Sequence, residues 1–183
     1  MHDAQDRDGE TGAWQRLLLI AAVAAAIVSS AAVMSSAFAD NAARQKLAVT
    51  RFDFTDTSGE AVDLTAEHDA RLKAFDVTLR DGLADSQKIK PTALDCAAGP
   101  CTATDPGVAA LAAQAKAADI RYLLVGGVHK VSTLVGRVEF AVLDLTGDKL
   151  LCNRRLTYRG DTDESWQRAA KFVARDLEQY CIP

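Results

Sequence analysis

The pattern of hydrophobic and polar positions changes its period along the chain, and each change marks an element. Residues 46–54, KLAVTRFDF, alternate with a period of two, which predicts a β-strand. After a polar turn at 56–59, apolar residues recur at three- and four-residue intervals. They are Leu72, Phe75, Leu79 and Leu83. This stripe predicts a helix from Thr65 that covers one face of a sheet.

The middle of the chain predicts a short strand, a helix and a buried strand. Residues 88–92, KIKPT, fit only a short strand near an edge, because Pro91 has no amide hydrogen to give to a ladder. Asp105 before Pro106 predicts a capped helix start. The apolar positions of this helix are Val108, Leu111, Ala112 and Ala115. Residues 122–128, YLLVGGV, are almost continuously apolar, as in a central strand that is buried on both faces.

Two further strands and a last helix complete the pattern. Residues 134–145 alternate in polarity, a tight turn follows at 146–148, and residues 149–158 form a second strand, so a β-hairpin is predicted. An apolar stripe then predicts a helix that starts near Asp163. Its members are Trp166, Ala170, Val173, Leu177 and Cys181.

The predicted order of elements is β-α-β-α-β-β-β-α. The first half of this order suits right-handed parallel crossovers, and the second half suits an antiparallel meander. The sequence therefore predicts one α/β domain at residues 40–183, with a single mixed sheet of about five strands and helices packed on it.

The segment before this domain has the features of a signal peptide. An apolar run at 17–34 is entered by Arg16 and followed by Ala37-Phe38-Ala39, whose small residues suit signal peptidase. We therefore expect residues 1–39 to be a signal peptide that is cleaved after Ala39, which makes the protein periplasmic. The alternative is a retained membrane anchor, because about 18 apolar residues can just span a bilayer.

Composition and charge exclude some partners. The chain has 49% hydrophobic residues and a net charge of −4, and it stays weakly negative without residues 1–39. Nothing in this balance favours binding to nucleic acid or to an anionic membrane surface.

The four cysteines, Cys96, Cys101, Cys152 and Cys181, predict two disulfides, since an even count is typical of exported chains. Cys96 and Cys101 can meet across one loop. Cys152 shares the apolar face of its strand, together with an ill-fitting Arg154, and Cys181 lies on the stripe of the last helix. If that helix runs back antiparallel to the strand, Cys152 and Cys181 end at the same edge. The alternative is a zinc site, although only one of the two pairs is close in sequence.

The stretch YRGDTDESW at 158–166 packs three acids ahead of the last helix. Asp161, with Glu164 three residues on, resembles a capping box, and acids in a first turn favour the helix dipole. A calcium loop would need more oxygen ligands at regular positions. The adhesion tripeptide at 159–161 would need a mobile loop. Capping is the favoured interpretation, and a role in partner binding with Trp166 is the other one that we retain.

Candidate chemistry elsewhere is sparse. Beyond the signal peptide the chain has two histidines, His68 and His129, and neither belongs to a known catalytic motif. Gly126-Gly127 predicts close backbone packing or a bulge in a strand. His129, Lys130 and Ser132 follow the carboxyl end of the predicted central strand, where open α/β sheets tend to bind ligands. Asp53 and Asp56 could face the same crevice or form a turn.

Three segments resemble a known family: LAVTRFDFTDTS at 47–58, GGVHKVSTLVGRVEFAVLDLTG at 126–147 and RGDTDESWQRA at 159–169. They are similar to an uncharacterised family of exported Gram-negative proteins, a domain of unknown function often found beside methanol-oxidation genes. The resemblance implies a periplasmic single-domain protein with no assigned activity. More distantly, the element order resembles the partner-binding α/β domains of the curli secretion channel protein, of lipoprotein activators of penicillin-binding proteins and of the Tol system's propeller protein.

We therefore expect an exported, non-catalytic accessory protein that binds an envelope protein or a small ligand, without a cofactor or metal. The candidate binding residues are His129, Lys130, Ser132, Arg159, Asp161, Asp163, Glu164 and Trp166. The alternative is a periplasmic hydrolase or redox-accessory enzyme that uses His129. That alternative requires His129 to lie within hydrogen-bond distance of an Asp, Ser or Cys in a concave pocket.

Overall fold

A computed structural model describes residues 44–96 and 99–183. The expected signal peptide at 1–39 lies outside these residues. Within them, the helices are too short or too polar for any one to cross a membrane.

The described residues form a mixed six-stranded sheet. Its strands are β1 (Gln45–Val49), β2 (Asp53–Asp56), β3 (Ile89–Thr92), β4 (Tyr122–Ser132), β5 (Val135–Asp144) and β6 (Lys149–Arg159). The strand order is β3-β1-β4-β5-β6, and β2 also pairs with β4. Strand β1 pairs in parallel with β3 and β4, and β2 pairs in parallel with β4, whereas β4, β5 and β6 form an antiparallel meander. The single mixed sheet, with β3 at one edge, confirms the prediction.

The predicted first strand is divided into β1 and β2. Val49 pairs with Leu124 and Asp53 with Gly127, so this side has one more residue than β4 over the same interval, as in a bulge. In the interruption, Phe52 turns its side chain into the core. A Cβ at Gly126 would lie 2.6 Å from the Phe52 ring, which confirms close packing at the glycine pair.

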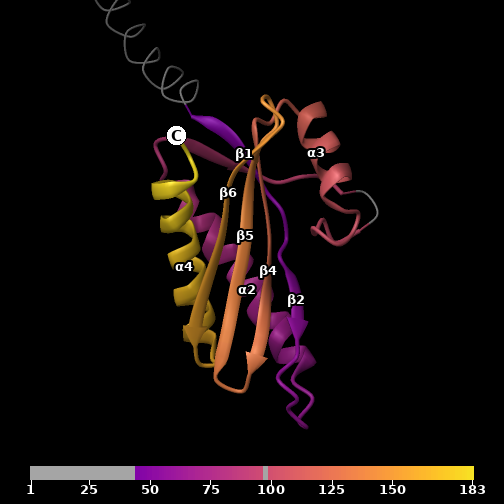
Figure 1. Ribbon diagram of the computed structural model, residues 1–183, viewed down its shortest axis with the longest axis vertical. Helices are drawn as coiled ribbons and strands as arrows, with labels where there is room; N and C mark the ends of the chain where they lie inside the picture. The colour runs from indigo at the N-terminus through magenta and orange to yellow at the C-terminus, as the bar shows by residue number, and fades with distance from the viewer. Residues whose placement is uncertain (1–43, 97–98) are drawn as a thin grey trace, which may run out of the picture. The chain divides into compact units, whose positions relative to one another are not determined.

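Helices α2 (Thr65–Ala84) and α4 (Asp163–Tyr180) cover one face of the sheet, and α3 (Val108–Ala117) lies on the other (Figure 1). The larger core lies under α2 and α4, where the predicted helical stripes meet alternate side chains of β4 and β5. The smaller core lies under α3, near the start of β4. We call the α2/α4 side the covered face and the other side the open face, because α3 covers only part of it.

Helix α3 begins two residues later than predicted. Asp105 does not cap it: the backbone N–H of Thr102 donates to Asp105 O (2.8 Å), and Asp105 N–H donates to Thr102 Oγ1 (3.1 Å). Since Asp105 is held in this turn, Pro106 precedes the helix instead of opening it. Gly107 is the N-cap residue, with a φ of 95° that suits glycine, and it has no side chain to cap with.

Both predicted disulfides are present. The Cα atoms are 5.3 Å apart in Cys152–Cys181 and 5.6 Å apart in Cys96–Cys101. The first bridge joins β6 to the end of α4, and the second lies beside α3. Arg154, the ill-fitting residue on the apolar face of β6, donates through Nε (2.8 Å) and Nη2 (2.9 Å) to the buried carboxylate of Asp176 on α4.

Candidate functional site

His129 and Lys130 lie on opposite faces of the sheet, because successive side chains of a strand alternate. Lys130 points to the covered face, as Val128 does, and only 3% of its surface is exposed. His129 points to the open face and is half-buried. The structure therefore does not bring these two candidates together in one crevice.

Lys130 is part of a partly buried group of charged and polar side chains that we call the Asp161 cluster. Its members are Glu60, His68, Arg71, Lys130, Asp161 and Trp166. Oδ2 of Asp161 accepts from Nε2 of His68 (2.9 Å) and pairs with Nζ of Lys130 (3.0 Å). Oδ1 accepts from Nε1 of Trp166 (3.0 Å) and lies 3.1 Å from Nη1 of Arg71. Three hydrogen-bond donors and the guanidinium of Arg71, from three elements, thus converge on one carboxylate.

The electrostatics of the cluster follow from this convergence. Burial alone would raise the pKa of Asp161, but hydrogen bonds from His68, Lys130 and Trp166 outweigh it and lower the pKa to about 2. Burial alone would lower the pKa of Lys130, but its bonds to Glu60 and Asp161 raise it instead. Both groups therefore stay charged at neutral pH.

Aromatic rings enclose the cluster. The ring of His68 lies 4.9 Å from that of Phe54 and is stacked at 6.0 Å on that of Trp166. Tyr158 meets Trp166 edge-on at 6.3 Å. Burial, followed by the nearby charge of Asp161, raises the pKa of Tyr158. This apolar wall keeps water away from the charges and strengthens their interactions.

The motif RGDTDESW covers the end of β6 and the start of α4. We call residues 160–166 the junction. Gly160 has a φ of 91°, which turns the chain out of β6. The N-cap is Thr162, whose side chain accepts from Ser165 N–H (3.3 Å), while Ser165 Oγ accepts from Thr162 N–H (3.0 Å). This reciprocal capping box corrects the expected cap at Asp161 with Glu164. Asp161 cannot cap the helix because its carboxylate is held inside the cluster.

The other two acids of the junction diverge. Asp163 accepts from Nε of Arg71 (2.9 Å) and Glu164 accepts from Nη1 of Arg168 (2.9 Å). Asp161 and Asp163 contact different nitrogens of Arg71, and Glu164 pairs with Arg168, so the three carboxylates bind arginines and are not gathered around a cation site. In residues 44–96 and 99–183 no group of three His, Cys, Asp or Glu side chains is arranged to hold a metal. The adhesion tripeptide is not displayed either, since the Asp161 side chain is 15% exposed.

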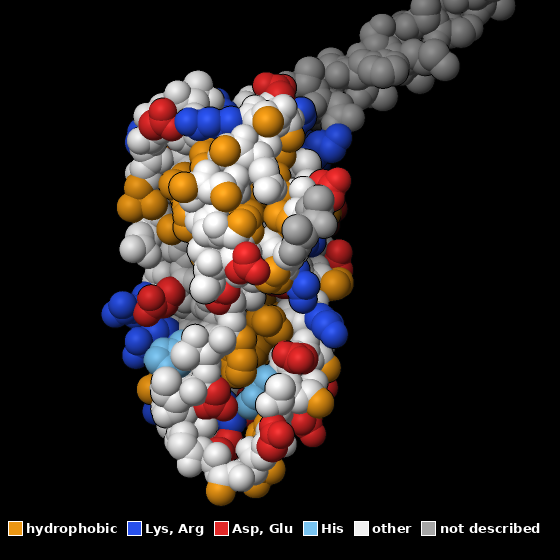
Figure 2. Space-filling model, turned by 90° about the vertical axis from the view of Figure 1, so that its right-hand side faces the viewer, with side chains coloured by type: hydrophobic (Ala, Val, Ile, Leu, Met, Phe, Trp, Pro, Cys, Tyr) orange, Lys and Arg blue, Asp and Glu red, His pale blue; other side chains and the backbone are white. Residues whose placement is uncertain are grey.

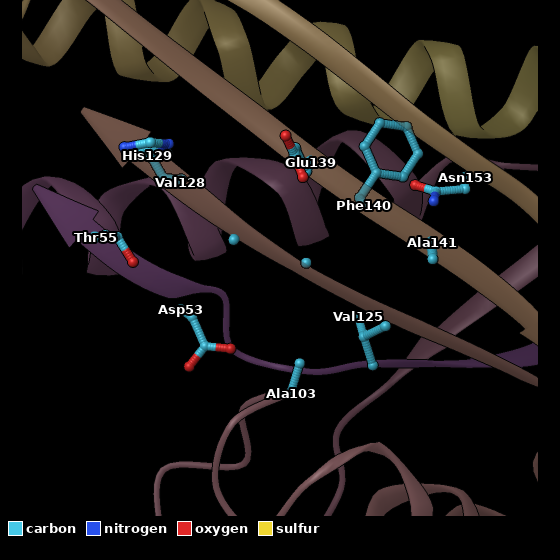
Figure 3. Close-up of a pocket in the computed structure, with 12 residues that line it drawn as sticks. Asp53, Thr55, Ala103, Val125, Val128, His129, Glu139, Phe140, Ala141 and Asn153 are labelled. Carbon is cyan, nitrogen blue, oxygen red and sulfur yellow. The ribbon is translucent and has the colours of Figure 1, made fainter. Parts of the chain in front are cut away.

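A groove of about 400 Å³ lies on the open face, beside the part that α3 covers. We call it the open-face groove. It is lined by Asp53, Thr55, Ala103, Val125, Gly126, Gly127, Val128, His129, Glu139, Phe140, Ala141 and Asn153. Figure 3 shows polar side chains of β2, β4, β5 and β6 around it, with His129 at one end and Asn153 on the far strand. Figure 2 shows the side of the molecule that carries α3, with hydrophobic side chains gathered in its upper half.

The polar groups of the groove are only partly engaged. Nε2 of His129 lies 2.6 Å from Oγ1 of Thr57, and Oδ2 of Asp53 accepts from Thr104 N–H (3.2 Å). Among the hydrogen bonds of the described residues, none joins His129 to an Asp, Ser or Cys side chain. The geometry that the enzyme hypothesis requires is therefore not met. Ser132, at the end of β4 beyond a register shift, belongs to neither the cluster nor the groove lining.

Sequence reasoning missed three members of the cluster: Glu60, His68 and Arg71. For His68 a signal existed, since it precedes Leu72 by four residues and so extends the apolar stripe of α2 by one turn. A histidine on a buried stripe needs a polar partner in the core. For Glu60, in the loop before α2, no periodic pattern marks the contact with Lys130.

Comparison with known protein families identifies the family of this chain. A family model described as "Protein of unknown function (DUF2380)" matches residues 45–177. The chain belongs to this family. The match confirms the resemblance to a domain of unknown function, and the motif RGDTDESWQRA within it forms the junction and part of the Asp161 cluster. No curated protein matches the sequence.

Several solved structures are similar. TolB from Acinetobacter baumannii aligns with 75% of this chain at 17% identity and a TM-score of 0.49, and this chain spans 28% of its length. The PelC dodecamer from Paraburkholderia phytofirmans aligns with 76% of this chain and 89% of its own, at 15% identity and a TM-score of 0.48. The LpoB C-terminal domain from Salmonella enterica aligns with 63% and 82%, at 11% identity and a TM-score of 0.42.

Proposed function

We propose that the protein is an exported, non-catalytic accessory protein of the bacterial envelope, and that it binds a protein partner or a small ligand in the open-face groove. The observation that carries this proposal is the groove itself. Its floor is formed by Gly126 and Gly127, where the backbone is open to approach, and its rim carries the polar groups of Asp53, His129 and Asn153. Apolar floors with a few polar groups are typical of binding sites.

The Asp161 cluster is assigned a structural role in this proposal. Lys130, Asp161 and Trp166 satisfy one another inside the protein and have little surface to offer a partner. Asp163 and Glu164 are exposed, but they pair with arginines of the same chain. Of the expected binding residues, His129 therefore remains the strongest, and Asn153 and Asp53 join it.

Two disulfides support export, since such bonds persist in oxidising compartments. We propose that the mature chain begins at Asp40 in the periplasm. Mass spectrometry of the protein from a periplasmic fraction should find this amino terminus. A full-length chain recovered only with membranes would contradict the proposal and favour the anchor.

Photo-crosslinking tests the groove in living cells. A photoreactive amino acid at Asn153 should capture a specific envelope protein, which mass spectrometry would identify. The same amino acid at Val77, which is 58% exposed on α2, is the matched control. It should not capture the protein that is captured from Asn153. The substitution His129→Ala should weaken the Asn153 crosslink. Equal capture from both positions, or none from Asn153, would count against the groove. The resemblance makes methanol-oxidation proteins the first partners to examine.

A further inference from the structure

The free edge of β6 forms a second groove, distinct from the open-face groove. Strand β6 is the last strand of the sheet and pairs with β5 on one side. Its other edge is unpaired in the described sheet, and α4 lies over the covered face next to it, so that Figure 1 shows the two elements side by side. A cavity of about 500 Å³ lies between them. We call it the β6–α4 groove; residues 155–159 of β6 line it, together with Arg168 and Phe172 of α4.

Five consecutive residues of β6, at 155–159, line this groove. Side chains of a strand alternate between the two faces, so some of these residues line the groove through their backbone atoms, as residues 125–129 of β4 do in the open-face groove. What distinguishes β6 is that it is the last strand of the described sheet and has a partner on one side only. An edge strand presents unpaired N–H and C=O groups that can pair with another extended chain. The groove therefore offers a backbone ladder together with side-chain contacts from α4.

The groove is positively charged. Three arginines line it, Arg155, Arg159 and Arg168, and no acidic residue does. The whole of β6, KLLCNRRLTYR, carries four basic residues and no acid, although the chain has a net charge of −4. Arg155 and Arg168 pair with Glu139 and Glu164 outside the lining, but these pairs are exposed and such pairs contribute little.

The groove also has an apolar contact. Phe172 of α4 is 48% exposed at its edge. Its ring could cover an apolar side chain of a bound strand, whose alternate side chains would point toward α4 and away from it. An occupant in which acidic and β-branched residues alternate would match both the arginines and Phe172.

We propose that the edge of β6 binds an extended acidic segment of a partner protein as an additional strand. This is the mode of recognition in which main-chain hydrogen bonds give affinity and alternate side chains give specificity. The proposal does not rest on the open-face groove. A second copy of this chain is a poor occupant, because β6 carries four basic residues and no acid, so two β6 strands would repel each other.

The probe is an octapeptide in which Val and Glu alternate, with a fluorophore and blocked ends, measured by fluorescence anisotropy. We expect saturable binding to the purified mature protein, and no binding of the matched peptide in which Lys replaces each Glu. The triple variant Arg155→Ala, Arg159→Ala, Arg168→Ala should lose at least tenfold in affinity. The control variant Lys73→Ala, Lys90→Ala, Lys116→Ala removes the same charge elsewhere and should bind nearly as well as the unmodified protein.

N-methylated peptides separate strand addition from charge attraction. Methylating every second amide keeps the charge and blocks one edge of the peptide. One of the two sets of methylations should abolish binding, and the other should be tolerated, because only one edge of the added strand faces β6. The proposal is overturned if both methylated peptides bind, if the arginine variant binds as well as its control, if no octapeptide binds, or if the protein dimerises through β6.

Discussion

His129 and Lys130 are neighbours on β4, and their surroundings differ completely. On the covered face, Lys130 is buried between Asp161 and Glu60, and its charge is matched by these carboxylates of the same chain. On the open face, His129 lies at the end of a groove with one neighbouring hydroxyl, that of Thr57. One strand therefore carries a closed internal network on one side and polar groups available to a ligand on the other.

This difference suggests that the covered face serves stability and that the open face serves binding. A buried charge that loses its partner is costly, so the Asp161 cluster can accept little change. A polar group at the rim of a groove is already solvated and can exchange water for a ligand. Substitutions on the covered face should therefore change the stability of the protein far more than substitutions at the rim of the groove.

Replacing Asp161 with Ala should lower the free energy of unfolding by about 3–5 kcal/mol, because the buried side chains of Lys130, His68 and Trp166 would lose the carboxylate that they share, and Lys130 would keep only its pair with Glu60. Urea unfolding monitored by Trp fluorescence gives the value. The control is Asp163→Ala, whose side chain is 79% exposed and should cost less than about 1 kcal/mol. Equal losses for the two variants would show that Asp161 acts only through the helix start.

Each face of the sheet has one disulfide, Cys152–Cys181 on the covered face and Cys96–Cys101 beside α3, so removing them one at a time compares their contributions to stability. Cys152 and Cys181 are 29 residues apart, so the variant with Ala at both should lose about 3.5 kcal/mol by loop entropy. Cys96 and Cys101 are 5 residues apart, and the same change there should cost about 2 kcal/mol. Thermal unfolding of the two double variants measures which disulfide contributes more stability. A larger loss on removing Cys96–Cys101 than on removing Cys152–Cys181 would contradict the prediction.

The sequence was sufficient for the fold where one pattern controls one element. Apolar stripes located α2 and α4, and the length of strand and helix brought Cys152 to Cys181. It failed where a tertiary contact overrode a local rule. Asp161 looked like a cap, but a network of side chains from α2 and β4 holds its carboxylate, and Thr162 caps the helix instead.

The candidate site was less predictable than the fold. The alternation of β4 alone could have separated His129 from Lys130, since Val128 and Lys130 share a parity. The contact between Lys130 and Glu60 could not be predicted, because a loop without periodicity supplies the carboxylate. Likewise the groove depends on how α3 is placed over the sheet, which no spacing in the sequence encodes.

A second buried carboxylate of the covered face should respond oppositely to pH. Burial raises the pKa of Asp76 to about 6, despite the N–H of Phe52 and the charges of Arg80 and Arg51. Its contribution to stability is therefore full below the ordinary pKa of 3.8 and is lost as pH rises through 6. Asp161, with its pKa of about 2, contributes above 3.8 and loses this contribution as pH falls toward 2.

The variant Asp76→Asn isolates the first of these effects. It should remove a fall in stability on the order of 2 kcal/mol between pH 4 and pH 7. Urea unfolding of both proteins across this range measures the difference between them. Parallel pH curves for the variant and the unmodified protein would show that the pKa of Asp76 is the same in the folded and unfolded states.

The smallest effect on stability is expected at His129. Replacing it with Ala removes one contact with Thr57 at the rim of the groove and leaves no buried charge behind, so the free energy of unfolding should change by less than about 0.5 kcal/mol. Capture of the partner from Asn153 should nevertheless fall, because the ring is part of the groove. The unfolding free energy and the crosslink together test whether His129 belongs to the binding surface while Lys130 belongs to the framework of the fold. A loss of several kcal/mol would place His129 with Lys130 in the framework of the fold, and unchanged stability with unchanged capture would remove it from the binding surface.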